Sequence, residues 1–406
     1  MTRPPLLPFD EALERLLSQA TPVDGIETLP IMAAHGRVLA RALRSTIDVP
    51  RADNTQMDGY ALRAAEGPAG ARLPVSQRIP AGHVGGALEP GTAARIFTGG
   101  LIPPGADAVV MQEMTEADGD TVIIREAPAP GQWIRRAGED IREGAEILPA
   151  GERLRPQAVG LAASVGLAEI PVRRRIRVAC FFTGDELATP GEPLAPGAIY
   201  NSNRYVLVGM LSALGCEVSD LGTVPDSLDA TRAALREAAA GNDLIVTSGG
   251  VSVGEEDHIR PALEAEGELS LWQIAVKPGK PLAYGKVRDG ATRQAHFIGL
   301  PGNPVSSFVT FLLFVRPFLL RLQGVERVAP TALPMRADFD WLRPDRRREF
   351  LRARVNPDGG LDLFPHQGSA VLTSTVWADG LVDNPPGGEI RRGDTVRFLP
   401  LDLLLA

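Results

Sequence analysis

Cysteine is scarce in this chain, and its scarcity excludes two kinds of architecture. Only Cys180 and Cys216 occur among the 406 residues, and both lie in apolar surroundings where a thiol packs into a core. Two cysteines cannot build a disulfide framework, and they form no Cys–His spacing that would hold zinc. The histidines are scattered rather than clustered, at His35, His83, His258, His296 and His366. We therefore expect a protein of the reducing cytoplasm.

Net positive charge and long apolar runs are also missing. The formal net charge is −8, which argues against a surface that follows nucleic-acid phosphates. The longest apolar run, Phe308 to Val315, is too short to span a bilayer. Met1 to Asp10 contains one arginine and no apolar core of the signal-peptide kind. The sequence predicts a soluble protein with neither a nucleic-acid nor a membrane partner.

Lysine is so rare that its few positions are informative. Of the 42 lysine and arginine residues only three are lysines, and Lys277, Lys280 and Lys286 fall within one stretch of ten residues. A chain that uses arginine elsewhere indicates a need for compact ammonium groups here. Lys277 and Lys280 flank a Pro-Gly pair, so both can face one oxyanion. The alternatives are chance clustering of the three lysines and, for the loop itself, a solvated surface turn.

The segment 243–257 passes from a buried strand to a glycine-rich loop. Leu244 to Val246 form the short apolar run that is typical of a parallel strand covered on both faces. Ser248, Gly249 and Gly250 follow, and paired glycines let backbone N–H groups approach an anionic ligand. Ligands of open α/β sheets bind at the carboxyl ends of strands, so we expect a site here. It is not a Walker loop, because no Gly-Lys-Ser/Thr follows.

Around this segment, strands alternate with helices. We predict strands at Ile176–Phe182, Glu217–Gly222, Asp243–Val246 and Ala295–Leu300, and helices at Asn203–Leu214, Leu228–Ala240 and Val305–Leu322. Such alternation indicates a doubly wound parallel sheet. The carboxyl ends of its strands would converge on one face.

The flanking parts of the chain show other patterns of apolar residues. Helical periodicity predicts helices at Phe9–Ala20, Ile31–Leu43 and Leu154–Gly166, with a structured loop at Ile47–Ala61. Short apolar runs between turns predict an all-β module at Arg72–Glu126 and a small β-barrel or sandwich at Ala337–Ala406. Because the first β module interrupts a helical region, we expect the chain to bring Asp140 back toward Asp58.

At 406 residues the chain is too long for one ordinary core. We expect four domains: a helical domain made of 1–45 and 141–173, an inserted β lid at 46–140, an α/β domain at 174–328 and a C-terminal β-barrel at 329–406. The fold class is therefore multidomain, α/β plus β.

Five acids stand in Gly-, Thr- and Ser-rich loops rather than on helix faces: Asp58, Asp140, Glu186, Asp226 and Asp257. Any one of them is more readily explained as a helix cap or a turn residue. As a set at strand ends they favour a hard divalent cation, Mg²⁺ rather than Zn²⁺, because oxygen donors dominate.

Six short motifs occur in one order along nearly the whole chain. They are Asn54-Thr-Gln-Met-Asp-Gly-Tyr-Ala61, Ile96-Phe-Thr-Gly-Gly100, Thr183-Gly-Asp-Glu-Leu187, Thr247-Ser-Gly-Gly-Val-Ser-Val-Gly254, Lys277-Pro-Gly-Lys-Pro281 and Gly299-Leu-Pro-Gly-Asn-Pro304. In this order they resemble the molybdopterin molybdenumtransferase family, the MoeA type that is similar to the gephyrin E domain.

The resemblance implies a homodimer, with the helical domain in dimerisation and the lid reaching across to the partner. It implies an enzyme that cleaves adenylylated molybdopterin with Mg²⁺, releases AMP and places molybdate on the dithiolene. Matched by motif, the expected catalytic residues are Asp58, Thr98, Asp140, Glu186, Asp226 and Asp257, of which Glu186, Asp226 and Asp257 would ligate the metal. Where many members carry a second acid, this chain has Ser227.

The substrate-binding residues implied in the same way come from the glycine loop, the lysine loop, the Pro-Gly-Asn-Pro turn and the last domain. They are Ser248, Gly249, Gly250, Lys277, Lys280, Pro301, Gly302, Asn303, Pro304, Arg352, Ser369 and Ser374. The match in the last domain rests on short motifs only. Other cofactor-biosynthesis proteins are possible partners.

Two other functions fit the same resemblance. One is a non-catalytic scaffold that binds a peptide, as the gephyrin E domain does, and the retained acids and lysines disfavour it. The other is adenylylation of molybdopterin, which a related stand-alone α/β domain performs. The additional lid and barrel argue against that alternative.

Overall fold

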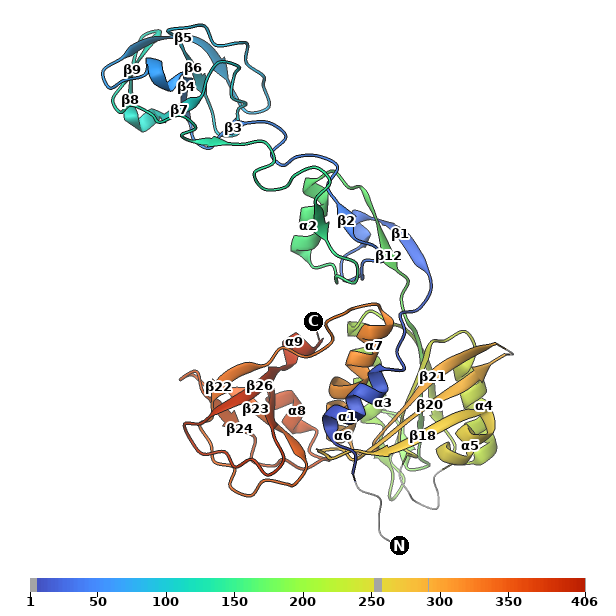
Figure 1. Cartoon of the computed structure of the whole chain (residues 1–406). Coiled ribbons are helices and arrows are strands. Elements are labelled where there is room, and N and C mark those ends of the chain that lie inside the picture. Colours follow the sequence, from blue (N-terminus) through green and yellow to red (C-terminus); the bar gives the residue numbers. More distant parts are fainter. Residues whose placement is uncertain (1–5, 252–257, 291, 406) are drawn as a thin grey trace. The chain divides into compact units, whose positions relative to one another are not determined.

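The structure is a computed structural model that describes residues 6–251, 258–290 and 292–405 (Figure 1). The chain forms two compact units. The first contains residues 1–27, 36–40 and 172–406, and the second contains residues 28–35 and 41–171. The chain passes between the units within β1 (Ile26–Pro30) and β12 (Glu169–Arg173), and again near Gly36 and Ala40.

The first unit is built on a six-stranded sheet. Its strands, in spatial order, are β16 (Glu217–Val224), β13 (Arg177–Thr183), β17 (Leu244–Ser248), β21 (Arg293–Leu300), β20 (Pro281–Asp289) and β18 (Gly267–Gln273). The first four are parallel, as predicted. The strand β20 runs antiparallel to both of its neighbours, β21 and β18, so the sheet is mixed rather than wholly parallel. The short link from β20 to β21 allows only an antiparallel return.

Helices cover both faces of this sheet, which makes it doubly wound (Figure 1). In β13, Val178, Cys180 and Phe182 face one core, whereas Ala179 and Phe181 face the other. The first face carries α1 (Phe9–Leu17), α3 (Ser202–Ala213), α6 (Pro304–Thr310) and α7 (Arg316–Leu322), and the second carries α4 (Leu228–Ala239) and α5 (Ile259–Glu266). Both cysteines are buried, as expected of core residues.

A π-helical turn at Phe311–Val315 joins α6 to α7. The resulting helical stretch, Pro304–Leu322, is long and apolar enough to cross a membrane by length and composition. It is longer than the apolar run Phe308–Val315, from which the sequence predicts no membrane span. Its apolar window is 94% buried inside the protein, so it is the central core helix of the first unit. It begins directly after the Pro-Gly-Asn turn that follows β21.

The C-terminal part of the first unit is a small barrel. Its strands follow the order β24 (Leu361–Leu363), β23 (Arg348–Val355), β25 (Gly380–Asn384), β26 (Thr395–Pro400) and β22 (Leu333–Arg336). A single bridge between Ala337 and Leu361 returns the last strand to the first and closes the sheet. The short strand β19 (Val276–Lys277) pairs in parallel with β23, which fixes the lysine loop to the barrel. Two short helices complete it, α8 (Thr373–Trp377) and α9 (Leu401–Leu405).

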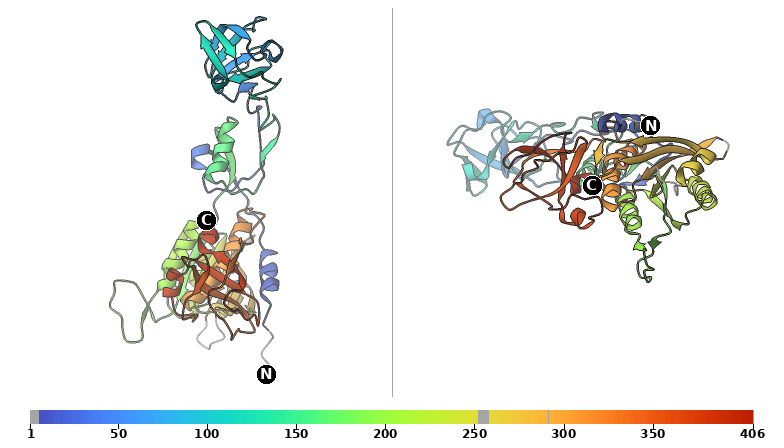
Figure 2. Two further views of the ribbon diagram at one scale, coloured as in Figure 1. Left: turned by 90° about the vertical axis from the view of Figure 1, so that its left-hand side faces the viewer. Right: turned by 90° about the horizontal axis from the view of Figure 1, so that it is seen from below.

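The pair β14 (Leu187–Ala188) and β15 (Ile199–Tyr200) forms a two-stranded sheet of its own. The segment between them, residues 189–198, is mostly exposed and extends away from the body of the first unit (Figure 2).

The second unit contains the predicted β module. Its sheet has the order β7 (Ala108–Met111), β4 (Gly59–Leu62), β6 (Ala93–Ile96), β5 (Arg72–Ile79), β9 (Thr121–Ile124) and β8 (Thr115–Asp118). Two small sheets, β3 (Asn54–Thr55) with β10 (Ile134–Arg135) and β2 (Leu43–Arg44) with β11 (Glu146–Leu148), lead to and from it. The helix α2 (Pro156–Ser164) lies close to the predicted position.

The predicted helix at Ile31–Leu43 is wrong. Only Ile31–Ala33 forms a single 3₁₀ turn, and the rest is irregular until β2. Gly36 has φ +76, a conformation that ends a helix, and the chain crosses between the units on both sides of Val38. Leu39 is nevertheless fully buried, so a helix-like spacing of core residues came from a non-helical segment. The loop Ile47–Ala61 is likewise less irregular than predicted, because it contains β3 and the start of β4.

Candidate functional site

A cavity of about 1090 Å³ lies at the carboxyl ends of β13, β17 and β21 in the first unit. Loops from the α/β sheet, the lysine loop and the barrel line it together. Twelve of the residues expected from the sequence line this cavity: Glu186, Asp226, Ser248, Gly249, Gly250, Lys277, Lys280, Pro301, Gly302, Asn303, Pro304 and Ser369.

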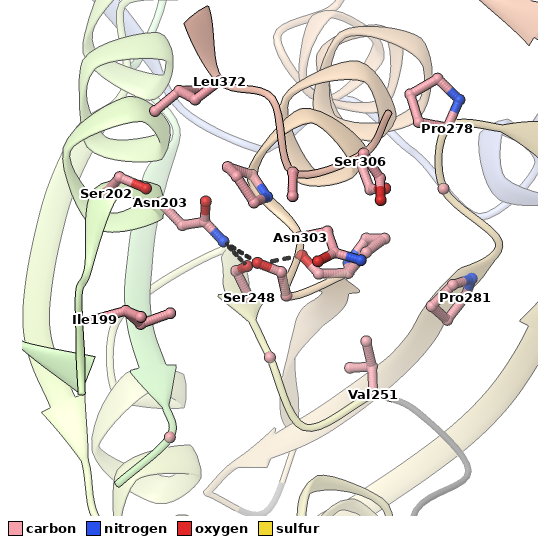
Figure 3. A pocket seen from close by; sticks show the side chains of 18 of the residues that line it. Ile199, Ser202, Asn203, Ser248, Val251, Pro278, Pro281, Asn303, Ser306 and Leu372 are labelled. Atoms are coloured by element: carbon pink, nitrogen blue, oxygen red, sulfur yellow. Dashed lines mark hydrogen bonds between the residues drawn. The ribbon is translucent and has the colours of Figure 1, made fainter. Parts of the chain in front are cut away.

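The floor of the cavity is held by a hydrogen-bond network around Ser248 (Figure 3). The Ser248 hydroxyl donates to the Pro301 carbonyl at 2.9 Å. The Asn203 amide donates to the Ser248 hydroxyl at 2.8 Å and to the Gly302 carbonyl at 2.7 Å. Two loops from different strands are thus fastened together by the first turn of α3. The sequence did not single out Asn203, which lines the cavity.

Gly249 stands where no other residue fits without strain. Its φ is +100, and a Cβ atom there would lie 2.7 Å from the Thr183 carbonyl oxygen. This glycine therefore lets the chain after β17 approach the end of β13 closely, whereas the predicted approach of its backbone to a ligand stays a prediction. The backbone of Gly249 and Gly250 forms part of the cavity wall.

Carboxylates gather on one side of the cavity. The backbone N–H of Asp185 donates to Asp226 at 3.3 Å, and that of Asp226 donates to Asp185 at 3.1 Å. Burial raises the pKa of the Asp226 carboxyl, and the like charges of Asp185 and Glu186 raise it further. Negative charge is thus concentrated here without a compensating ion pair among residues 6–251, 258–290 and 292–405.

This donor set suits Mg²⁺ in its chemistry. The donors are carboxylate oxygens, and their mutual repulsion is what a bound cation would relieve. Within the part of the chain that the structure describes, no group of three or more His, Cys, Asp or Glu residues is arranged to hold a metal ion. The third expected ligand, Asp257, lies outside the described residues.

Ammonium groups line another part of the wall, and the two lysines differ. The Lys277 ammonium is paired, 3.1 Å from Glu349 Oε1 and 3.5 Å from Asp345 Oδ2. Lys280 is half-buried and forms no ion pair with any residue in the described ranges. Lys277 is thus held by two acids, and that both lysines face one oxyanion stays a prediction.

Arg352 and Ser374 lie behind the wall rather than on it. Arg352 is 1% exposed, and its guanidinium donates to the Ser374 hydroxyl at 3.1 Å and to the Gly368 carbonyl at 3.2 Å. Burial lowers its pKa to about 10. Since Gly368 and Ser369 line the cavity, Arg352 holds that loop from behind.

The remaining three expected residues belong to the second unit. The Thr98 backbone N–H and hydroxyl both donate to one Asp58 carboxylate oxygen, at 2.8 and 2.7 Å, and these bonds lower the pKa of Asp58. Asp140 is exposed, and its backbone N–H donates to Val49. In the described chain no hydrogen bond joins Asp140 to Asp58.

Three family models match the chain in succession. They are the MoeA N-terminal region (domains I and II) at residues 7–166, a probable molybdopterin binding domain at 179–321 and the MoeA C-terminal region (domain IV) at 334–401. A molybdopterin molybdenumtransferase of Haemophilus influenzae is 38% identical over 98% of this chain and 100% of its own length. The chain belongs to the molybdopterin molybdenumtransferase family. Its members are transferases of molybdenum cofactor biosynthesis.

Other members of the molybdopterin molybdenumtransferase family support the same assignment. A Nostoc relative of the same name is 38% identical over 80% of this chain and 75% of its own. The crystal structure of the molybdopterin biosynthesis MoeA protein from Pyrococcus horikoshii superposes with a TM-score of 0.86 at 29% identity, covering 98% of this chain and 100% of that one. The MoeA architecture predicted from the motifs is therefore confirmed.

Proposed function

We propose that this transferase acts on adenylylated molybdopterin, releases AMP and places molybdate on the dithiolene. One observation carries the proposal: a single cavity presents carboxylates at Glu186 and Asp226 and ammonium groups at Lys277 and Lys280. A reaction that breaks a phosphate linkage and binds an oxyanion needs both kinds of group side by side.

The roles divide between the two sides of the cavity. Glu186 and Asp226, with Asp257, would hold Mg²⁺, which when bound neutralises phosphate charge. The loop Ser248–Gly250 and the turn Pro301–Pro304 bind the pterin and phosphate end of the substrate. Lys280 binds the incoming oxyanion directly, whereas Lys277, tied to Glu349, contributes a fixed positive charge.

The second unit completes the site from the partner subunit of a homodimer. In this role Asp58 would supply a carboxylate that the Thr98 backbone N–H and hydroxyl hold in place. Asp140 joins them as a further acid of the lid. We place the protein in the cytoplasm, where it would pass its product to other cofactor-biosynthesis proteins.

An AMP-release assay tests the proposal. Wild-type protein incubated with adenylylated molybdopterin, Mg²⁺ and molybdate should release AMP, and Glu186→Gln should reduce the rate at least 100-fold. Glu192→Gln, an acid on the exposed segment after β14, is the matched control and should retain activity. A peptide-binding scaffold or an adenylyltransferase would release no AMP above the Glu186→Gln background, and that result would refute the proposal.

A further inference from the structure

Arg347 lines the cavity although no sequence motif pointed to it. We propose that Arg347 is a further oxyanion-binding residue of this site, which offers a two-pronged guanidinium edge to a tetrahedral oxyanion. The inference rests on the proposed function and adds a third cation, of a different shape, beside the two lysines.

Arg347 is held rigidly by one acid. Its Nε donates to Asp345 Oδ1 at 3.0 Å and its NH2 group donates to Asp345 Oδ2 at 2.8 Å. The Asp345 backbone N–H in turn donates to the buried Glu349 carboxylate at 3.0 Å. These bonds with Arg347 hold the pKa of Asp345 well below its usual range. A guanidinium fixed in this way loses little conformational entropy when it binds a ligand.

The ion pair with Asp345 uses only one edge of the Arg347 guanidinium. Of the five N–H groups of an arginine, Asp345 takes those on the Nε/NH2 edge. On the opposite edge, formed by NH1 and NH2, the structure gives one long contact, from NH1 to the Val276 carbonyl at 3.4 Å. That edge matches two oxygens of a phosphate or molybdate group. The Arg347 side chain is 26% exposed, so a ligand can reach it.

The surrounding charges leave the wall cationic. Asp345 Oδ2 is shared between Arg347 and the Lys277 ammonium, which lies 3.5 Å away. Two acids, Asp345 and Glu349, therefore face the cations Arg347 and Lys277, and Lys280 adds a positive charge without a paired acid in the described ranges. An anion that approaches this wall meets an excess of one positive charge.

The next residue provides a matched control. Arg348 forms the same kind of two-pronged pair, with Asp383 at 2.6 and 2.8 Å. Arg348 does not line this cavity but faces α1, where it also contacts Asp10 at 2.9 Å. Replacing either arginine by glutamine removes an Arg–Asp pair from the same edge of the barrel, and only one replacement touches the cavity.

The experiment measures equilibrium binding of molybdate, and separately of AMP, to the full-length protein. Arg347→Gln should weaken binding of at least one of them about 10- to 100-fold, as expected for a charge-assisted pair of bonds. Arg348→Gln should leave both affinities unchanged. A loss for molybdate alone assigns the edge to the incoming oxyanion, and a loss for AMP alone assigns it to the phosphate of the substrate.

Asp345→Asn separates direct binding from a positioning role. If Arg347 contacts the ligand, Asp345→Asn keeps an amide oxygen that holds the guanidinium but removes the negative charge, so binding tightens while Arg347→Gln weakens it. If Arg347 only holds Asp345 and Lys277 in place, both variants weaken binding alike, and the inference is wrong. Equal binding by Arg347→Gln and Arg348→Gln would also overturn it.

Failure of this inference is distinguishable from failure of the proposed function. Wild-type protein that releases AMP while Arg347→Gln binds normally refutes the inference alone. Wild-type protein that releases no AMP refutes the proposed function, and the inference falls with it. Should Arg347→Gln fail to fold, as judged by thermal unfolding, Arg347→Lys retains the charge without the two-pronged edge and should still weaken binding several-fold.

Discussion

Lys277 and Glu349 stand opposite each other in the parallel pair β19–β23, with Nζ and Oε1 3.1 Å apart. Glu349 is fully buried, and its second oxygen accepts from the Trp341 indole at 2.8 Å and from the Asp345 backbone at 3.0 Å. The pair therefore joins the barrel to the cavity wall and fixes where the Lys277 charge lies.

Breaking this pair should cost stability. Glu349→Gln places an amide donor against a lysine or an indole N–H, so the free energy of unfolding should fall by about 3 kcal/mol. Urea unfolding of Glu349→Gln, Lys277→Met and the double variant should show a coupling of about 1–3 kcal/mol. Arg15→Gln, which removes the exposed ion pair with Glu11, should change the free energy of unfolding by less than about 0.5 kcal/mol. Purely additive effects at Lys277 and Glu349 would contradict this account.

Replacing Asp226 should raise the stability of the protein and abolish its activity. The Asp226 carboxyl has a raised pKa, so the folded state binds its proton more readily than the unfolded state does, and its contribution to stability falls as pH rises through the folded pKa. Asp226→Asn keeps the acceptor for the Asp185 N–H but removes the repulsion. Its melting temperature at pH 7 without Mg²⁺ should exceed that of the wild type, whereas AMP release should be lost. A lower melting temperature would show that Asp226 is stabilising instead.

Gly249 and Gly302 offer a paired test of the cavity floor. A Cβ atom at Gly249 meets the Thr183 carbonyl at 2.7 Å, whereas one at Gly302 meets nothing closer than 3.8 Å. Gly249→Ala should lower the free energy of unfolding by about 1–3 kcal/mol and weaken substrate binding. Gly302→Ala should stay within about 0.5 kcal/mol of the wild type. Equal losses for both variants in denaturant unfolding would rule out the strain argument.

The sequence was most informative where chemistry depends on short-range order. The glycine loop, the Pro-Gly-Asn-Pro turn and the acids after β13 and β16 were all assigned to strand ends, and the structure brings them to one cavity. This worked because parallel strands present their carboxyl ends on one face, whatever the details of the helices between them.

Other features could not be predicted because they depend on long-range pairing. Arg347 is one of three consecutive arginines in an arginine-rich chain, so nothing local distinguishes the one that reaches the cavity. Lys277 and Glu349 lie 72 residues apart in the sequence, and they meet because β19 joins the barrel sheet. The buried segment around Leu39 imitated a helical period without forming a helix.

Acid should destabilise the first unit through His296. Its Nδ1 lies 2.9 Å from the Tyr284 hydroxyl, and burial, with the nearby Lys286 charge, lowers its pKa from 6.5 to about 4. The folded state thus binds fewer protons, so stability is lost as pH falls from 6.5 towards 4, by up to about 3 kcal/mol. His296→Asn should flatten the dependence of urea unfolding on pH over that interval. The exposed His366→Asn should leave it unchanged, and an unaltered slope in His296→Asn would disprove the assignment.

Complementation between chains tests whether the lid acts across a homodimer. Asp58 and Lys280 belong to different compact units, and Lys280 has no paired acid in the described ranges, so Lys280→Gln leaves no carboxylate without its partner. If the lid serves the partner's cavity, a heterodimer of Asp58→Asn and Lys280→Gln chains has one intact site. Equal co-expression should then restore about a quarter of wild-type AMP release, because half of the dimers are mixed and each has one active site. Lys280→Gln mixed with Lys277→Gln has no intact cavity and should show no recovery. Absence of recovery in the first mixture would place the lid over the cavity of its own chain.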